Sequence, residues 1–322
     1  MRLALMLSPQ PDEMWPLAAQ LGVADVVTGL PRARPGAPPA WDFMPLLHMT
    51  RRFADAGLTV SVVESAPPMD RIRLGLSGRD EEIAHVCELL TNMGAVGIPI
   101  WCYNWMAVFG WQRTSLATPA RGGALVTGYD HALMASAPPT AAGHVADEQL
   151  WESYAYFLER VVPVAERAGV KMALHPDDPP ISPIRGIARI FRGVDAMTRA
   201  VEMAPSDYHG ITFCQGTFAT MGADIPAAIR SFGERGKIHF VHFRDIRGTA
   251  ERFVETFHDD GQTDMLQAMR CYKEIGFTGP MRPDHVPTME GDPNETPGYT
   301  NRGRLYAIGY MRGLMEAVHA GM

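Results

Sequence analysis

Four residues of types that bind metals each end a short apolar segment of the chain. They are His175, Cys214, His242 and Asp284, at the ends of KMALH, GITFC, IHFVH and GPMRPD. Because they stand about 28 to 42 residues apart, they cannot form a zinc finger, whose paired ligands are roughly two to five residues apart. Successive βα units of a barrel would instead bring them to one rim, where barrel enzymes carry out their chemistry. The pattern therefore predicts a metal site at that rim.

Two imidazoles, one thiolate and one carboxylate can bind a divalent metal and leave coordination positions open for a substrate. Zn2+ would suit the thiolate, whereas Mn2+ or Fe2+ would suit the oxygen atoms of a sugar acid. A single histidine or cysteine at a strand end is more often a core residue. Four of them at consecutive strand ends favour metal binding, with the choice of metal left open.

Further polar residues adjoin these ligands. Arg244 lies two residues after His242, so strand alternation predicts that its guanidinium faces the same pocket and could hold a carboxylate with two hydrogen bonds. This favours an acidic small molecule as the substrate. His285, next to Asp284, is a candidate general acid or base, or else only a hydrogen-bond partner of the metal ligands. Asp178 would order its loop, contact the substrate or orient a ligand.

Eight short apolar or β-branched segments, bounded by Gly, Pro or polar residues, predict strands that are buried on both faces. They cover 3–7, 23–30, 58–64, 96–103, 170–174, 210–214, 237–243 and 279–284. Helical patterns lie between them, at roughly 80–94 and 194–204 and most clearly from Asp147, a predicted N-cap, to Gly169, a predicted C-cap. This α/β pattern predicts a single (β/α)8 TIM barrel over residues 1–322.

One connection between these elements is much longer than usual. Residues 104–146, between the fourth strand and the 147–169 helix, are rich in Gly, Ala, Thr and Pro. Because this extended loop follows the carboxyl end of a strand, it should hang over the active-site rim as a lid or as a contact between copies of the chain. After the eighth strand, residues 293–304 have prolines, glycines and no apolar periodicity, which predicts a loop on the same rim.

The composition is that of a globular protein, with 46% hydrophobic and 20% charged residues in a chain of 322. No apolar run approaches the roughly 18 residues that cross a membrane. The net charge of -7 disfavours nucleic acid as a partner. The amino terminus lacks a small-residue cleavage site, so a cytoplasmic protein is expected. The four cysteines show no paired spacing, which disfavours disulfides.

Several segments share their order and spacing with one known family. They are SVVES at 61–65, CYNWM at 102–106, WQRT at 111–114, VVPVAERAGVKMALHPDDPP at 161–180, GITFCQGTF at 210–218, HFVHFRD at 239–245, FHDDGQTDM at 257–265, MRPDH at 281–285 and PGYTNRGRL at 297–305. Together they resemble D-mannonate dehydratase over most of the chain from about residue 55 onward.

The resemblance implies a xylose-isomerase-like barrel that dehydrates D-mannonate to 2-keto-3-deoxy-D-gluconate in hexuronate breakdown, with Mn2+ or Fe2+ as the metal. The family's metal ligands fall on His175, Cys214, His242 and Asp284, its active-site residues on Arg244, His285 and Tyr299, and the expected substrate contacts on Glu64, Asn104, Asp178 and Arg244. A homo-oligomer, either a dimer or a larger assembly, is also expected. Removal of the C2 proton and departure of the C3 hydroxyl both need a proton-transfer group, and His285 and Tyr299 are the candidates in either order.

Some features depart from the family pattern. Residues 115–146 are shorter and richer in Gly, Ala and Pro than the family's helical insertion, Val286 and Pro287 replace a Gly-His pair, and Asp259 replaces a glutamate. They leave open a related metal-dependent isomerase, epimerase or lyase that acts on another sugar or sugar acid. A non-catalytic metal- or ligand-binding barrel is disfavoured by the complete set of ligands and polar residues.

Overall fold

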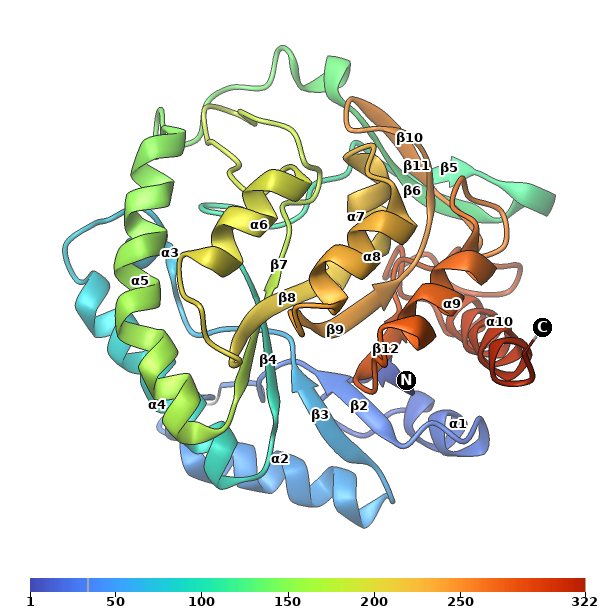
Figure 1. Ribbon diagram of the computed structural model, residues 1–322, viewed down its shortest axis with the longest axis horizontal. Helices are drawn as coiled ribbons and strands as arrows, with labels where there is room; N and C mark the ends of the chain where they lie inside the picture. The colour runs from blue at the N-terminus through green and yellow to red at the C-terminus, as the bar shows by residue number, and fades with distance from the viewer. Residues whose placement is uncertain (34, 322) are drawn as a thin grey trace.

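The chain forms a closed barrel of eight parallel strands, seen in a computed structural model that describes residues 1–33 and 35–321 (Figure 1). Its strands are β1 (Arg2–Met6), β2 (Asp25–Thr28), β3 (Thr59–Val63), β4 (Ile100–Asn104), β7 (Lys171–His175), β8 (His209–Cys214), β9 (Ile238–Phe243) and β12 (Pro280–Pro283). They follow one another around the barrel in sequence order, so their carboxyl ends meet at one rim. The predicted (β/α)8 barrel is confirmed, and each of its eight predicted strands is found.

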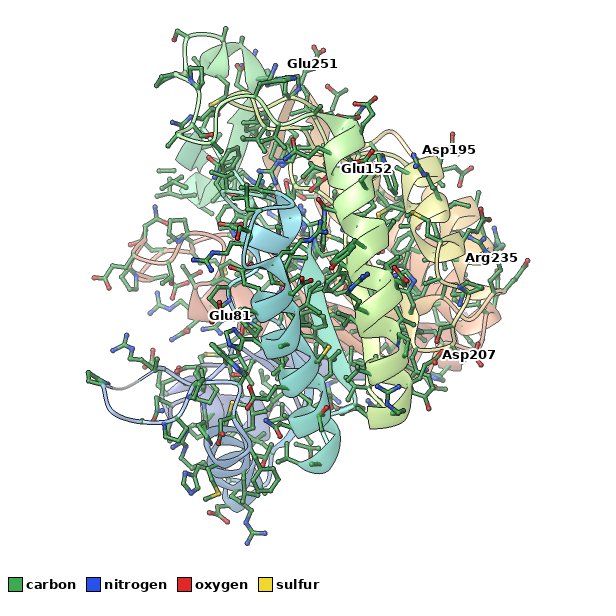
Figure 2. All side chains as sticks on the ribbon, turned by 90° about the vertical axis from the view of Figure 1, so that its left-hand side faces the viewer. Glu81, Glu152, Asp195, Asp207, Arg235 and Glu251 are labelled. Carbon is green, nitrogen blue, oxygen red and sulfur yellow. The ribbon has the colours of Figure 1, made fainter. Side chains whose placement is uncertain are left out.

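Helices cover the outside of the barrel, because each has an apolar face that packs on the strands. They are α1 (Met14–Gln20), α2 (Phe43–Asp55), α3 (Asp70–Arg73), α4 (Arg79–Ala95), α5 (Asp147–Ala168), α6 (Val194–Glu202), α7 (Gln215–Thr220), α8 (Ile225–Gly233), α9 (Met265–Glu274) and α10 (Asn301–His319). Figure 2 shows α4 and α5 side by side, with exposed charges such as Glu81 and Glu152 on the outer surface. Among the described residues, no helix combines the length and apolar character that a membrane span requires.

The three helices predicted from periodicity correspond to α4, α5 and α6, with one difference at the start of α5. Ala146, and not Asp147, occupies the N-cap position, and Gly169 caps the other end in a left-handed conformation as predicted. The Asp147 carboxylate stands in the first turn, where an acid is favoured by the helix dipole. It accepts a hydrogen bond from Arg192 at 2.7 Å.

A second sheet of four antiparallel strands lies outside the barrel, at the upper right of Figure 1. Its strands run in the order β10 (Ile246–Thr249), β11 (Arg252–Glu255), β6 (Leu125–Asp130) and β5 (Ser115–Pro119). The 104–146 segment, expected as an extended loop, therefore contains two strands and two short 3-10 turns, Arg121–Gly123 and His131–Met134. The sequence does not reveal this sheet, because β6 pairs with β11 across more than a hundred residues.

The loop predicted over 293–304 ends earlier than expected, because α10 begins at Asn301. Gly303 contributed to the loop prediction, but it lies inside the helix where the helix meets the barrel rim. A Cβ at this position would collide with the carbonyl oxygen of Pro287. This glycine therefore allows a close approach of helix and loop and does not form a turn.

The barrel interior is filled by small and β-branched side chains and one phenylalanine, which alternate along the strands with residues that face the helices. This inner cluster consists of Ala4, Val27, Val62, Ile100, Cys102, Ala173 and Phe240. Near the amino end of β9, His239 is 3% exposed and neither ring nitrogen has a hydrogen-bond partner within the described chain. Burial and the nearby Lys171 charge lower the pKa of His239 to about 3.

We expect His239 to make the protein less stable in acid. The folded chain keeps this imidazole neutral down to about pH 3, whereas the unfolded chain protonates it near the ordinary pKa of about 6.5. Unfolding therefore takes up a proton below that value, and stability is lost as the pH falls through this window. Between about pH 6.5 and 5, the free energy of unfolding of His239→Leu should therefore fall by roughly 2 kcal/mol less than that of the parent.

Denaturant unfolding of the metal-free protein at the two pH values measures this effect. His48→Gln, a change at an exposed position, is the matched control and should keep the acid dependence of the parent. The same dependence in His239→Leu would show that this histidine is not responsible.

Candidate active site and metal centre

A cavity of about 290 Å³ opens at the carboxyl ends of the barrel strands. Eight of the ten residues predicted for the site line it, namely Glu64, Asn104, His175, Asp178, His242, Asp284, His285 and Tyr299. The other two, Cys214 and Arg244, are buried next to cavity residues but are not part of the lining. The lining also contains Arg73, Trp111 and Arg282.

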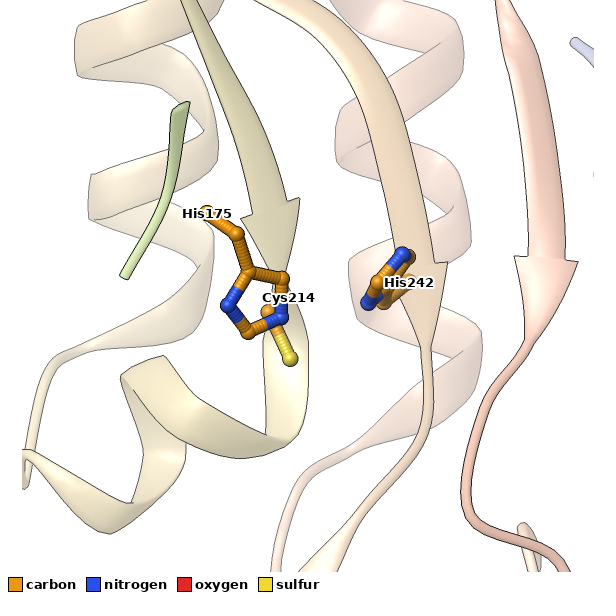
Figure 3. Close-up of side chains that lie close together, drawn as sticks. All are labelled: His175, Cys214 and His242. Carbon is orange, nitrogen blue, oxygen red and sulfur yellow. The ribbon is translucent and has the colours of Figure 1, made fainter. Parts of the chain in front are cut away.

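Three of the predicted metal ligands meet at the ends of consecutive strands. His175 ends β7, Cys214 ends β8 and His242 lies in β9, and their ligand atoms are all within 4.8 Å of one another (Figure 3). Cys214 and His242 are direct partners in the β8–β9 register. The fourth residue, Asp284, follows β12, and its Oδ2 atom lies 3.4 Å from Nδ1 of His242.

The hydrogen bonds of both histidines leave a ring nitrogen available for a metal. Nδ1 of His175 donates to the carbonyl of Pro176 at 2.6 Å, which leaves the lone pair of Nε2 free. Nε2 of His242 lies 3.3 Å from the Glu64 carboxylate. Its Nδ1 atom, facing Asp284, is buried and has no hydrogen-bond partner among the described residues. A buried unpaired nitrogen is costly, and a bound metal would satisfy it.

The surroundings of Cys214 favour the thiolate, the form that binds metals. Burial alone would raise the pKa of its thiol, but the Arg244 charge and His175 outweigh burial and hold this pKa well below its usual value. The hydroxyl of Thr217 donates to the sulfur at 3.1 Å. Because the thiolate is the metal-binding species, the four donors together fit a divalent metal ion.

Arg244 does not face the cavity in the way that strand alternation predicts. Its guanidinium, in a residue only 1% exposed, donates to Glu255 at 2.8 and 2.9 Å and to Asp178 and Thr217 at 2.8 and 2.9 Å. β9 ends at Phe243, so the strand no longer sets the direction of the next side chain. The Nε atom of Arg244 nevertheless lies 3.1 Å from Oδ2 of Asp284, and a contact of Arg244 with the substrate stays a prediction. All its carboxylate partners come from the protein itself.

Arg113 links the second sheet to the same buried charges. It precedes β5 and donates to both oxygens of Asp178, at 2.7 and 2.9 Å, and to Glu255 of β11 at 2.5 Å. Asp178, Glu255 and His285 would be close enough to hold a second metal, but the guanidiniums of Arg113 and Arg244 already neutralise these carboxylates. The network instead fastens the second sheet to the rim. Sequence reasoning missed Glu255, which no motif marks, whereas the WQRT motif could have indicated Arg113.

Arg282 and Glu64 form a second ion pair at the cavity wall. The guanidinium donates to both Glu64 oxygens, at 3.0 and 2.8 Å, and to Oδ1 of Asp284 at 2.8 Å. Burial would raise the pKa of Glu64, but the Arg282 and His242 charges lower it to about 2. Glu64 is therefore an anion that neutralises Arg282 and orients the imidazole of His242.

His285 and Tyr299 both line the cavity and carry groups that could transfer protons. His285 has a φ of 47°, a left-handed conformation that costs a residue other than glycine about 1 kcal/mol or more. Its ring lies edge-on to Trp111 and 5.5 Å from the Tyr299 ring. Burial lowers the pKa of His285 to about 3 and raises that of Tyr299. The Tyr299 hydroxyl donates to Oδ1 of Asp284 at 3.1 Å.

Known proteins share both the sequence and the fold. The family model for D-mannonate dehydratase (UxuA) matches residues 16–143 and 140–322. Mannonate dehydratase of Thermotoga maritima is 34% identical over 313 residues, with 86% of each chain covered. The Streptococcus pneumoniae protein of the same name is 32% identical over 333 residues, covering 95% of this chain and 89% of its own.

Solved structures agree with these sequence matches. The crystal structure of mannonate dehydratase from Streptococcus suis serotype2 superposes with a TM-score of 0.92 at 32% identity, covering 100% of this chain and 94% of that one. A xylose isomerase domain protein from Planctomyces limnophilus, with a TM-score of 0.65 and 15% identity over 99% of this chain and 98% of its own, shares the fold alone. Because the family match extends over nearly the whole chain, this protein belongs to the D-mannonate dehydratase family.

Proposed function

We propose that this chain is a metal-dependent hydro-lyase that converts D-mannonate to 2-keto-3-deoxy-D-gluconate. The observation that carries the proposal is the convergence, in a chain of this family, of His175, Cys214, His242 and Asp284 beside a cavity that also contains His285 and Tyr299. The first four residues can hold a cation, and the last two can move protons. These are the two requirements of dehydration next to a carboxylate.

The reaction removes the proton from C2 of the aldonate and releases the hydroxyl of C3 as water. A divalent metal bound at the four ligands would supply positive charge for the negative charge that develops on the substrate carboxylate. We assign the two proton transfers to His285 and Tyr299 as a pair, because both line the cavity and their rings lie 5.5 Å apart. The enol formed by loss of water then becomes the 2-keto acid by tautomerisation.

The metal that we propose is Mn2+ or Fe2+, with Zn2+ as the alternative. Only Cys214 favours a soft ion, whereas the Asp284 carboxylate and an oxygen-rich substrate favour a harder one. We also treat residues 1–322 as one catalytic unit that forms a homo-oligomer. Leu116 and Leu133, which are 52% and 66% exposed on the 104–146 segment, support a contact between copies of the chain there.

Incubation with a panel of aldonates and aldoses tests the proposed function. Metal-loaded protein should form a 2-keto-3-deoxy acid from D-mannonate with a kcat/KM of about 10,000 M⁻¹s⁻¹ or more, and metal-stripped protein should form none. Product is detected by its keto-deoxy chromophore and by mass spectrometry. If the protein instead isomerises or epimerises another sugar without loss of water, the proposed function is wrong and the protein is a related isomerase or epimerase.

A further inference from the structure

One of the arginines at the cavity is paired less closely with buried carboxylates than the other. Two arginines line the cavity among the described residues, Arg73 and Arg282. Arg282 is bound by two buried or half-buried carboxylates, those of Asp284 and Glu64. Among the described residues, Arg73 has one ion-pair partner, Asp70 at 3.1 Å, whose side chain is 55% exposed. A solvated partner of this kind contributes little to neutralising a neighbouring charge. The charges of Glu82 and Asp177 act on Arg73 more weakly.

The donors of Arg73 are also incompletely used. Its side chain is 13% exposed, yet Nε is buried without a hydrogen-bond partner in the described chain. One terminal nitrogen donates to the backbone oxygen of Asn104 at 3.0 Å and approaches its side-chain oxygen at 3.4 Å. Burial lowers the pKa of Arg73, whereas neighbouring carboxylates raise that of Arg282 despite its burial. A buried guanidinium with a free donor fits an anion supplied from outside the protein.

Arg73 is also close to the metal ligands. Asn104, its hydrogen-bond partner, ends β4 and pairs in register with His175 of β7. Neighbouring strands lie roughly 4.8 Å apart. A ligand bound to a metal at His175 would therefore have to extend across about one strand spacing to reach the guanidinium. A small acid can span this distance.

We propose that Arg73 binds the carboxylate of the acid substrate and selects acids over neutral sugars. The identity of the acid rests on the proposed function, but recognition of a carboxylate does not require turnover. This assigns to Arg73 the role that the sequence predicts for Arg244. Because the carboxylate becomes more negative as the C2 proton leaves, Arg73 also stabilises the transition state.

Three variants test this assignment. Arg73→Gln should lower kcat/KM for D-mannonate by roughly 10- to 100-fold, as expected for loss of a hydrogen bond to a charged group. Arg73→Lys keeps the charge without the fork and should recover part of the loss. Arg71→Gln is the matched control, because Arg71 is on the same short helix, is 53% exposed and pairs outside the cavity with Glu81. It should behave like the parent.

Binding provides the readout that separates a role in recognition from a structural one. Calorimetry of metal-stripped and metal-loaded protein compares D-mannonate with D-mannonamide, its neutral amide. The parent should prefer the acid, and Arg73→Gln should lose this preference while keeping the melting temperature of Arg71→Gln. If Arg73→Gln and Arg73→Lys weaken the binding of acid and amide equally, or leave the preference for the acid intact, Arg73 does not recognise the carboxylate.

The same data separate this inference from the proposed function. A parent protein that binds acids through Arg73 but forms no 2-keto-3-deoxy acid would overturn the proposed function only. A working dehydratase in which Arg73→Gln retains the affinity and preference of the parent would overturn the role of Arg73 only.

Discussion

Cys214→Ala should lose most of its bound metal and reduce kcat/KM for dehydration by roughly 1,000-fold or more. Loss of the thiolate removes the only sulfur donor from the group formed with His175 and His242. Metal charge at a reacting carboxylate is worth several kcal/mol, and about 4 kcal/mol corresponds to this factor. Elemental analysis after dialysis against limiting metal, together with initial rates, measures both consequences.

Two other buried cysteines provide matched controls. Cys271 lies in α9 away from the cavity, so Cys271→Ala should retain metal and activity. Cys102 lines the cavity on the other side of His242, where it forms a second possible group with Glu64. If Cys102→Ala loses its metal and Cys214→Ala keeps it, the metal is held by the group of Glu64, Cys102 and His242 instead.

Tyr299→Phe should lower kcat by roughly 100- to 10,000-fold with the metal still bound, the range expected when a positioned acid or base is lost. The change keeps the ring beside His285 and removes only the hydroxyl that donates to Asp284. Single-turnover product formation measures the chemical step. Tyr310→Phe on α10, outside the cavity lining, is the control and should leave the rate unchanged.

Exchange of the C2 proton with D2O then shows which of the two proton transfers Tyr299 performs. If Tyr299 protonates the departing hydroxyl, Tyr299→Phe should still exchange the C2 proton while forming little product. If it removes the C2 proton, exchange and product should fall together. A rate within a few-fold of the parent, with normal metal content, would leave Tyr299 as a packing residue and give the proton transfers to His285.

The barrel could be predicted from sequence because its signals are local. Each barrel strand is a short apolar run between breakers, and the candidate ligands His175 and Cys214 stand at the last residue of their strands. Parallel strands in sequence order bring such residues to one rim without further information. The positions of the candidate metal ligands could therefore be predicted from the strand ends alone.

The contacts around this rim were harder to predict, because they depend on residues outside the barrel strands. Arg244 follows the last residue of β9, so alternation could not fix its direction. Glu255 belongs to a strand whose partner is far away in sequence, and its role depends on Arg113 and Asp178. Arg73 carries no motif, and the role that we propose for it rests on its place in the cavity lining and on its buried, unpaired Nε, which only the fold reveals.

The sheet outside the barrel also limits how the rim of this protein can be altered. Its strands come from two separate stretches, 115–130 and 246–255, that pair through β6 and β11. Arg113 precedes the first stretch and Glu255 ends the second. A change that removes one hairpin alone would therefore break the Arg113–Glu255 ion pair and upset the charge balance of the buried network with Asp178 and Arg244. The two hairpins therefore depend on each other for their pairing and for the balance of their buried charges, although they lie far apart in the sequence.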